Sequence, residues 1–230
     1  MRATKVLLGL SVLVVPVLSA VPAAAAPPVL PQDCAVPPFI DLTQFNVVIG
    51  TDRSDVLTGT SGPDFFCGRL GNDVIYARAG NDLVLADTTT FFGNVNAAGG
   101  NDIVHAGPGD DEVLPGPGND IVYGEAGDDF LALAVGDDRG FGGPGEDGIQ
   151  GGFGRDVIDA GPGNDFAAGG FGADVVQGGP GDDALFGEIP PDSPPPPPGV
   201  PLPGPARDIC EGGPGFDLGL DCDVSTSIEA

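Results

Sequence analysis

The chain is poor in the residues from which most protein cores and basic surfaces are built. It has no tryptophan, two tyrosines and one methionine in 230 residues, and 8 basic residues stand against 34 acidic ones. The scarcity of large side chains argues against a conventional globular core. The formal net charge of −26 argues against binding to nucleic acid or to an anionic membrane surface. The 40 glycines and 25 prolines would favour a disordered chain if they were not periodic.

What the chain does contain is a nine-residue repeat marked by aspartate. An uninterrupted series carries it at Asp102, Asp111, Asp120, Asp129, Asp138, Asp147, Asp156, Asp165, Asp174 and Asp183. The same spacing links Asp55, Asp64, Asp73 and Asp82 before that series, and Asp208 and Asp217 after it. A fixed period predicts a repeat solenoid in which one carboxylate returns to the same place on every repeat. Such a column needs a cation, and without one the excess of acids makes disorder the expected state.

Each repeat divides into a glycine-rich loop and a short strand. Glycines at positions two and four permit positive φ angles and close backbone approach, so the first six residues can form a tight loop. The loop directs carbonyl oxygens inward, and the aspartate at position six adds a carboxylate. Hard oxygen ligands in a flexible loop suit calcium better than zinc or magnesium. Positions seven to nine allow one short strand, whose middle residue faces inward while its neighbours face outward.

Two repeats complete one coil, with a short strand on each side. Repeat n then lies above repeat n+2 at about 4.8 Å, the usual spacing between paired strands. The expected fold is all-β, a right-handed parallel β-roll, or β-solenoid, of stacked nonapeptide repeats.

The best copies of the repeat follow one motif. Residues 151–159 and 178–186 both read G-G-x-G-x-D-x-U-x, where U is a large apolar residue. This motif resembles the hemolysin-type calcium-binding repeat family, also called the RTX nonapeptide family, over residues 50–220. In that family calcium lies between stacked loops and is bound by aspartates and loop carbonyls of both. The resemblance therefore implies several Ca²⁺ ions shared between repeats n and n+2, for example between Asp102 and Asp120.

The resemblance also implies a set of metal-binding aspartates at position six. These are Asp64, Asp73, Asp82, Asp102, Asp111, Asp120, Asp129, Asp147, Asp156, Asp165, Asp174, Asp183 and Asp217. Less regular copies add Asp55, Asp138 and Asp208. In two of these copies Arg53 and Ala206 hold a glycine position, and in the third Gly140 replaces the apolar residue of the strand. Metal binding at these three aspartates is therefore the weaker expectation.

The segments outside the repeats divide the chain further. Arg2 and Lys5 precede an apolar stretch and an alanine cluster at residues 23–26, which together predict a cleaved secretory signal peptide. The expected segments are a signal peptide at 1–26, an N-terminal approach and cap at 27–49, a first calcium-binding repeat array at 50–85, an insertion or degenerate repeat at 86–96, the main calcium-binding array at 97–186, a proline-rich loop at 187–202, and final repeats with a C-terminal cap at 203–230. The first interruption could be a looped-out insertion or a degenerate half-coil with a bulge.

The four cysteines suggest two disulfides, because the signal peptide implies an oxidising environment. Three connectivities are formally open. Cys34 and Cys67 flank the start of the repeats, whereas Cys210 and Cys222 lie at their end, where a solenoid needs capping. We therefore favour the pairs Cys34–Cys67 and Cys210–Cys222. A zinc site is not expected, because His105 is the one histidine and is distant in sequence.

These features predict a secreted protein, extracellular or at the cell surface, that binds calcium ions and is not an enzyme. Acid pairs such as Asp110–Asp111 do not indicate catalytic carboxylates, because position five varies, and no serine lies in a nucleophile-elbow sequence. Neither nucleic acid binding nor membrane insertion is expected. The alternative is an adhesion or matrix module that calcium only stiffens. Its outward residues, such as Tyr76 and Tyr123, would bind a surface polymer or polysaccharide.

The exported chain should lack the signal peptide and carry no free thiol. Cleavage removes Arg2 and Lys5 but no acid, which leaves 34 acidic against six basic residues and a net charge near −28. The intact mass of the exported protein, measured before and after alkylation without reductant, checks both points. Retention of Met1, or alkylation of any cysteine, would contradict this expectation.

Overall fold

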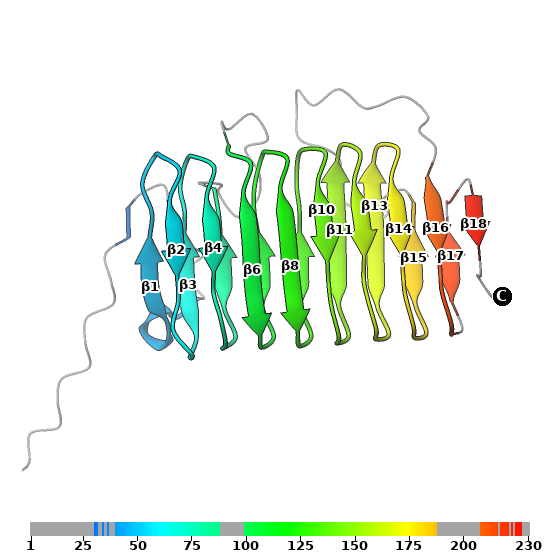
Figure 1. Ribbon diagram of the computed structural model, residues 1–230, viewed down its shortest axis with the longest axis horizontal. Helices are drawn as coiled ribbons and strands as arrows, with labels where there is room; N and C mark the ends of the chain where they lie inside the picture. The colour runs from blue at the N-terminus through cyan, green and yellow to red at the C-terminus, as the bar shows by residue number, and fades with distance from the viewer. Residues whose placement is uncertain are drawn as a thin grey trace, which may run out of the picture.

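The repeats form two parallel β-sheets that face each other along the long axis of the molecule (Figure 1). The computed structural model describes residues 30–31, 34, 36, 40–87, 99–187, 208–215, 217–220, 222 and 224–226. The expected signal peptide and the proline run at residues 194–198 lie outside these residues. Within the described ranges each sheet has 9 strands, and successive strands along the chain alternate between the two sheets.

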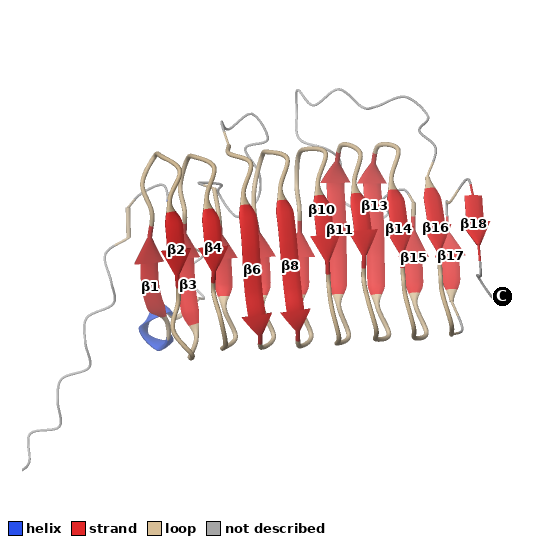
Figure 2. Cartoon of the chain, viewed as in Figure 1, coloured by secondary structure: helices blue, strands red, loops and turns tan. Residues whose placement is uncertain are grey.

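The strands are short, and Figure 2 shows them connected by loops at both ends of the strands. The first sheet consists, in spatial order, of β1 (Asn46–Ile49), β3 (Asp64–Cys67), β5 (Leu83–Leu85), β7 (Glu112–Leu114), β9 (Phe130–Ala132), β11 (Gly148–Phe153), β13 (Phe166–Phe171), β15 (Ala184–Phe186) and β17 (Leu218–Leu220). The second consists of β2 (Val56–Thr58), β4 (Val74–Tyr76), β6 (Ile103–Pro108), β8 (Ile121–Ala126), β10 (Arg139–Phe141), β12 (Val157–Asp159), β14 (Val175–Gln177), β16 (Ile209–Glu211) and β18 (Val224–Thr226). The predicted all-β, parallel β-roll is therefore confirmed.

Helical structure in the part of the chain that the structure describes is limited to 3₁₀ conformation, at Cys34 and in one short helix before the first strand. The 3₁₀-helix η2 (Leu42–Gln44) directly precedes β1. No helix among these residues is long and apolar enough to cross a membrane.

Each strand pairs in parallel with the strand one full coil later. The register is 18 residues between regular repeats, as where Ile158 pairs with Val176, and 15 residues between the last two strands of the second sheet, where Ile209 pairs with Val224. It is 29 residues across the first interruption, where Val74 pairs with Ile103, and 34 across the second, where Val176 pairs with Cys210. The alternation between sheets continues through both interruptions, so neither adds a half-coil. The strand pairing therefore supports an insertion at the first interruption rather than a degenerate half-coil.

One inward residue from each strand builds the core, as the alternation predicts. The fully buried members are Phe66, Ile75, Val84, Val104, Val113, Val122, Leu131, Ile149, Ile158, Ala167, Val176, Leu185 and Cys210. The irregular copy at 133–141 has Gly140 in this place. A Cβ on Gly140 would lie 3.1 Å from Cδ1 of Leu133, which is itself fully buried. Leu133, at a position normally held by glycine, thus fills the space that Gly140 leaves.

The expectation that both neighbours of the inward residue face solvent is wrong in β3 and β5. Phe65 and Leu85 lie on the outer face of the first sheet, yet both are buried. Leu30, Val36 and Leu42 of the N-terminal segment belong to the same apolar cluster and cover this face. The repeat pattern could not reveal the burial, because the covering residues lie outside the repeats.

Both expected disulfides are present, one at each end of the array. Cys34–Cys67 ties the N-terminal segment to β3, and Cys210–Cys222 joins β16 to the residues that precede β18. The Cα atoms are 5.9 Å apart in each pair. These crosslinks limit fraying of the terminal coils, which have a neighbour on one side only.

Candidate metal centre

The loops that join the strands use two left-handed backbone positions. Gly152 at position two has a φ of 105°, and Gly154 at position four has a φ of 139°. A side chain on Gly154 would also strike the carbonyl oxygen of Gly136 in the preceding coil. Stacking of the loops therefore requires glycine at position four, and favours it at position two, as the motif predicted.

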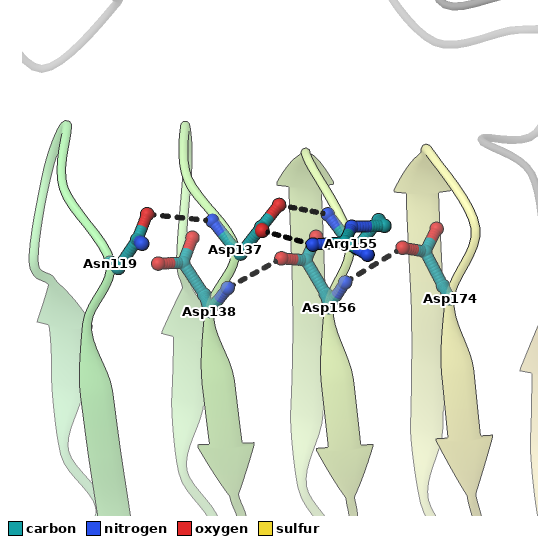
Figure 3. A network of polar contacts seen from close by, with 6 residues as sticks. All are labelled: Asn119, Asp137, Asp138, Arg155, Asp156 and Asp174. Carbon is teal, nitrogen blue, oxygen red and sulfur yellow. Dashed lines mark hydrogen bonds and ion pairs between the residues drawn. The ribbon is translucent and has the colours of Figure 1, made fainter.

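The position-six aspartates form a hydrogen-bonded ladder in each of the two rows of loops. One row contains Asp55, Asp73, Asp102, Asp120, Asp138, Asp156, Asp174 and Asp208, and the other contains Asp64, Asp82, Asp111, Asp129, Asp147, Asp165, Asp183 and Asp217. The N–H of Asp138, for example, donates to Oδ1 of Asp156 at 2.9 Å (Figure 3). All members except Asp55 are at most 3% exposed. Asp138 and Asp208 therefore belong to the same ladder as the other aspartates, although the repeats that carry them are irregular.

The second carboxylate oxygen has no hydrogen-bond donor in most of these loops. The buried Oδ2 atoms without a partner belong to Asp73, Asp82, Asp102, Asp111, Asp120, Asp129, Asp138, Asp147, Asp156, Asp165, Asp183 and Asp217. A buried carboxylate oxygen without a donor is costly unless a proton or a cation neutralises it. Because the same atom is unpaired in successive coils, this cost recurs along both rows.

Burial raises the pKa of these carboxyls and neighbouring acids raise it further, although the hydrogen bonds of the ladder oppose the shift. The pKa rises to about 6 for Asp82 and Asp147, to about 7 for Asp102, Asp111, Asp120, Asp156 and Asp165, and to about 8 for Asp129 and Asp138. At neutral pH the metal-free ladder therefore holds many carboxyls close to their titration midpoint. A bound cation would favour their ionised form.

Backbone carbonyls face the same space as the unpaired oxygens. A Cβ on Gly151 would lie 2.5 Å from Oδ2 of Asp156 and against the carbonyl oxygen of Gly169, one coil later. In the described ranges no group of three or more histidine, cysteine, aspartate or glutamate side chains could hold an ion by itself. A metal site here would combine aspartate carboxylates with loop carbonyls, which is the hard oxygen set that calcium takes in proteins. The residues present therefore fit calcium.

A second ladder, formed by position five, runs along the exposed side of the loops in the opposite direction. Asp137 Oδ1 accepts from the N–H of Arg155, and Asn119 Oδ1 accepts from the N–H of Asp137, each at 3.0 Å (Figure 3). The acceptor here lies one coil before the donor, whereas in the inner ladder it lies one coil after. Asp110 accepts from the N–H of Asp128 in the same way, at 3.2 Å. Adjacent acid pairs thus serve two separate ladders.

The first two loops differ from the others at the oxygen that is elsewhere unpaired. Oδ2 of Asp64 accepts from the N–H of Thr60 at 2.6 Å and from its hydroxyl at 3.1 Å. Thr51 donates to Oδ2 of Asp55 in the same two ways, at 2.6 and 2.8 Å. Asn46 also donates to Oδ1 of Asp64, at 2.6 Å. Asp55 and Asp64 therefore belong to the ladders, but hydrogen-bond donors already occupy the place where a cation would bind.

One buried carboxylate lies outside the nonapeptide pattern. Asp87 is 1% exposed, its Oδ2 accepts from the N–H of Gly100 at 3.0 Å, and its Oδ1 is unpaired. Burial, and next the charge of Asp102, raise the pKa of Asp87 to about 8. Sequence reasoning missed this residue because it lies in the first interruption, where no aspartate is due. The feature of the sequence that could have identified Asp87 is an acidic residue two positions after the end of a regular strand, where the next loop begins.

Comparison with known protein families agrees with the repeat geometry. The family model described as the RTX calcium-binding nonapeptide repeat (4 copies) matches residues 49–84, 96–131, 116–139, 133–167, 141–176 and 159–189. Together these matches cover more than half of the chain. No curated protein matches the chain significantly.

Replacing Asp147 by alanine should reduce calcium binding more than replacing Asp159 does. Asp147 is buried in the inner ladder with an unpaired Oδ2, whereas Asp159 lies at the outward ninth position of its repeat. Equilibrium dialysis against calcium measures the number of ions bound by Asp147→Ala and by Asp159→Ala. Equal losses in the two variants would show that the ligands are not at position six.

Acid should stabilise the metal-free fold. Folding raises the pKa of Asp102 to about 7 and that of Asp138 to about 8 from the ordinary value of 3.8, so it takes up protons. The stabilising contribution is complete below about pH 4 and is lost as the pH rises through 7 to 8. Circular dichroism in excess chelator should therefore show a β signal that grows as the pH falls from about 9 to about 4. A signal independent of pH over this range would contradict the expectation.

Proposed function

The chain belongs to the family of RTX calcium-binding nonapeptide repeats, and on that premise we propose that it is a secreted, non-enzymatic β-roll protein whose folding is driven by calcium. The observation that carries the proposal is the row of buried Oδ2 atoms without donors, such as those of Asp102, Asp120 and Asp138. Such a row opposes stacking of the coils when it is ionised. A cation that binds oxygen removes this opposition, and its binding energy then contributes to folding.

The proposed ligands are position-six aspartates from loops one coil apart. Asp102 pairs in this way with Asp120, and Asp111 with Asp129, with loop carbonyls completing the set. The ladder holds Oδ1 of each aspartate against a backbone N–H, and this leaves Oδ2 for a cation. When bound, calcium supplies the positive charge that these buried oxygens lack.

The proposed sites are not equivalent along the array. Asp138 and Asp208, although their copies are irregular, lie in the inner ladder and are each 1% exposed. We include both among the ligands. Asp55 and Asp64 contribute least, because Thr51 and Thr60 already donate to their Oδ2 atoms.

A role outside the cell and without catalysis is supported by the chemistry of the loops. The acid pairs are engaged in two ladders, which gives both members a structural role. RTX repeats are typical of secreted proteins, and the two disulfides suit an oxidising compartment. Extracellular calcium modules bind their ions with dissociation constants of about 10⁻⁴ to 10⁻³ M, which is suited to the calcium available there.

The alternative function is an adhesion or matrix module that binds a surface polymer or polysaccharide, and one observation favours it. Four outward rings stack in a column across β4, β6, β8 and β10, namely Tyr76, His105, Tyr123 and Phe141. An open pocket of about 340 Å³ beside them is lined in part by Arg78 and Glu125. Arg78 can bind a carboxylate group, and Glu125 can accept hydrogen bonds from hydroxyl groups. The rings cover one another's faces, however, so the column stiffens the sheet more than it offers stacking surfaces. Retention of the calcium-loaded protein on immobilised polysaccharide would favour this alternative.

Calcium should convert a largely disordered chain into the β-roll in a cooperative transition. Each site joins two coils, so filling one site orders its neighbour. The midpoint should lie at about 10⁻⁴ to 10⁻³ M, and magnesium should replace calcium poorly because it gives up its water reluctantly. Circular dichroism during a calcium titration of chelator-treated protein, with magnesium as the control, measures both effects. A full β signal in excess chelator at neutral pH would refute calcium-driven folding.

A further inference from the structure

The second position of the loop occurs in two backbone conformations, which decide where its side chain lies. At Arg78 (φ 85°) and Glu125 (φ 77°) the backbone is left-handed and the side chain is exposed. Thr51 and Thr60 lack the positive φ, and their hydroxyls contact the position-six carboxylate of their own loop. A side chain at position two can therefore reach the space beside the aspartate Oδ2.

Asp87 occupies this second position in the loop that ends at Asp102. Its backbone N–H donates to the carbonyl of Pro115 at 3.0 Å, which is the pairing that Gly143 makes with Ala160 in a regular loop. Asp87 also lacks the positive φ, like the two threonines. The first interruption therefore falls inside one loop, between its second and third positions, and Asp87 is the last loop residue before it.

In this loop both position two and position six are acidic, namely Asp87 and Asp102. In the first two loops position two is a threonine and only position six is acidic. Oδ1 of Asp87 and Oδ2 of Asp102 are both buried without a donor, and each residue is 1% exposed. At Thr60 and Asp64 the side chains of the same two positions lie 3.1 Å apart. Two ionised carboxylates in this arrangement repel each other unless a cation lies between them.

The surroundings of Asp87 supply a further carbonyl oxygen and leave no room for a side chain on the neighbouring glycine. A Cβ on Gly99 would strike both Oδ2 of Asp87 and the carbonyl oxygen of Pro117 in the next coil. The N–H of Gly100 holds Oδ2 of Asp87, which leaves Oδ1 as the unpaired atom. Carboxylate and carbonyl oxygens here form a hard ligand set.

We propose that Asp87 and Asp102 jointly hold a cation of the calcium class in a site that the nonapeptide motif does not encode. The inference rests on the proposed calcium binding and adds one carboxylate to a single loop. Calcium affinity rises with the number of charged ligands. This loop therefore binds its ion first as free calcium increases, and it begins the ordering of the coils on either side.

The test compares Asp87→Asn with Glu125→Asn in the full mature chain. Both substitutions remove one acid at loop position two, but Glu125 is exposed and its Oε1 lies 3.3 Å from Nδ1 of His105 on the outer face of the sheet. Equilibrium dialysis at stepped free calcium, starting from chelator-treated protein, gives the concentration at which the first ion binds. Asp87→Asn should raise that concentration at least about tenfold. Glu125→Asn should leave it within about twofold of the parent, because exposed charges contribute little.

Equal first-ion affinities in the two variants would overturn the proposal. If Asp87→Asn gives no β signal at saturating calcium, Asp87→Thr is measured instead, because it recreates the hydrogen-bonded pair of Thr60 and Asp64. It should show the same loss of the first ion. A parent protein that binds no calcium would refute the proposed function itself, whereas normal binding by both Asp87 variants refutes only this site.

Discussion

The charge of the buried carboxylates is the constraint on which the rest of the molecule depends. Every coil places aspartates inside its loops, where a backbone N–H satisfies one oxygen and the other is mostly left without a donor. The core that opposes this cost consists of the inward strand residues and a few residues at the first loop position, and several of them are valine or alanine. We propose that this apolar burial does not offset two ionised columns in the loops at the strand ends. The proposed calcium is therefore part of the fold rather than an addition to it.

The two ladders explain why the loops stack in one register. Position six accepts from the coil before it, and position five accepts from the coil after it, so each loop is tied in both directions. Asn and Asp serve equally at position five because only their Oδ1 atom is needed. Position six has a stricter requirement, because its second oxygen must also be charged for a cation to bind. Position six is therefore always aspartate along this chain, whereas position five varies.

Position two shows how one backbone angle changes the chemistry of an otherwise constant loop. Glycine, or a residue in the left-handed conformation, leaves Oδ2 of the position-six aspartate without a hydrogen-bond donor. Thr60 places two hydrogen-bond donors beside Oδ2 of Asp64 and so satisfies that oxygen without a metal, whereas Asp87 adds a second acid to its loop. The threonine loops lie beside the Cys34–Cys67 disulfide and the apolar cluster over β3. The N-terminal end of the array is therefore the part that needs calcium least.

The nine-residue period by itself determined the fold class, the inward residues, the columns of aspartate and the expectation of calcium, because each depends only on spacing within one coil. The placement of the cysteines at the two ends likewise predicted their pairing. Only the tertiary structure decided the burial of Phe65 and Leu85, the pairing of Thr60 with Asp64, and the place of Asp87 in a loop. These depend on contacts with no period: an N-terminal segment that covers two strands, and a side-chain direction set by a local backbone angle. A repeat motif describes what is common to its copies, whereas these features arise where one copy differs from the next.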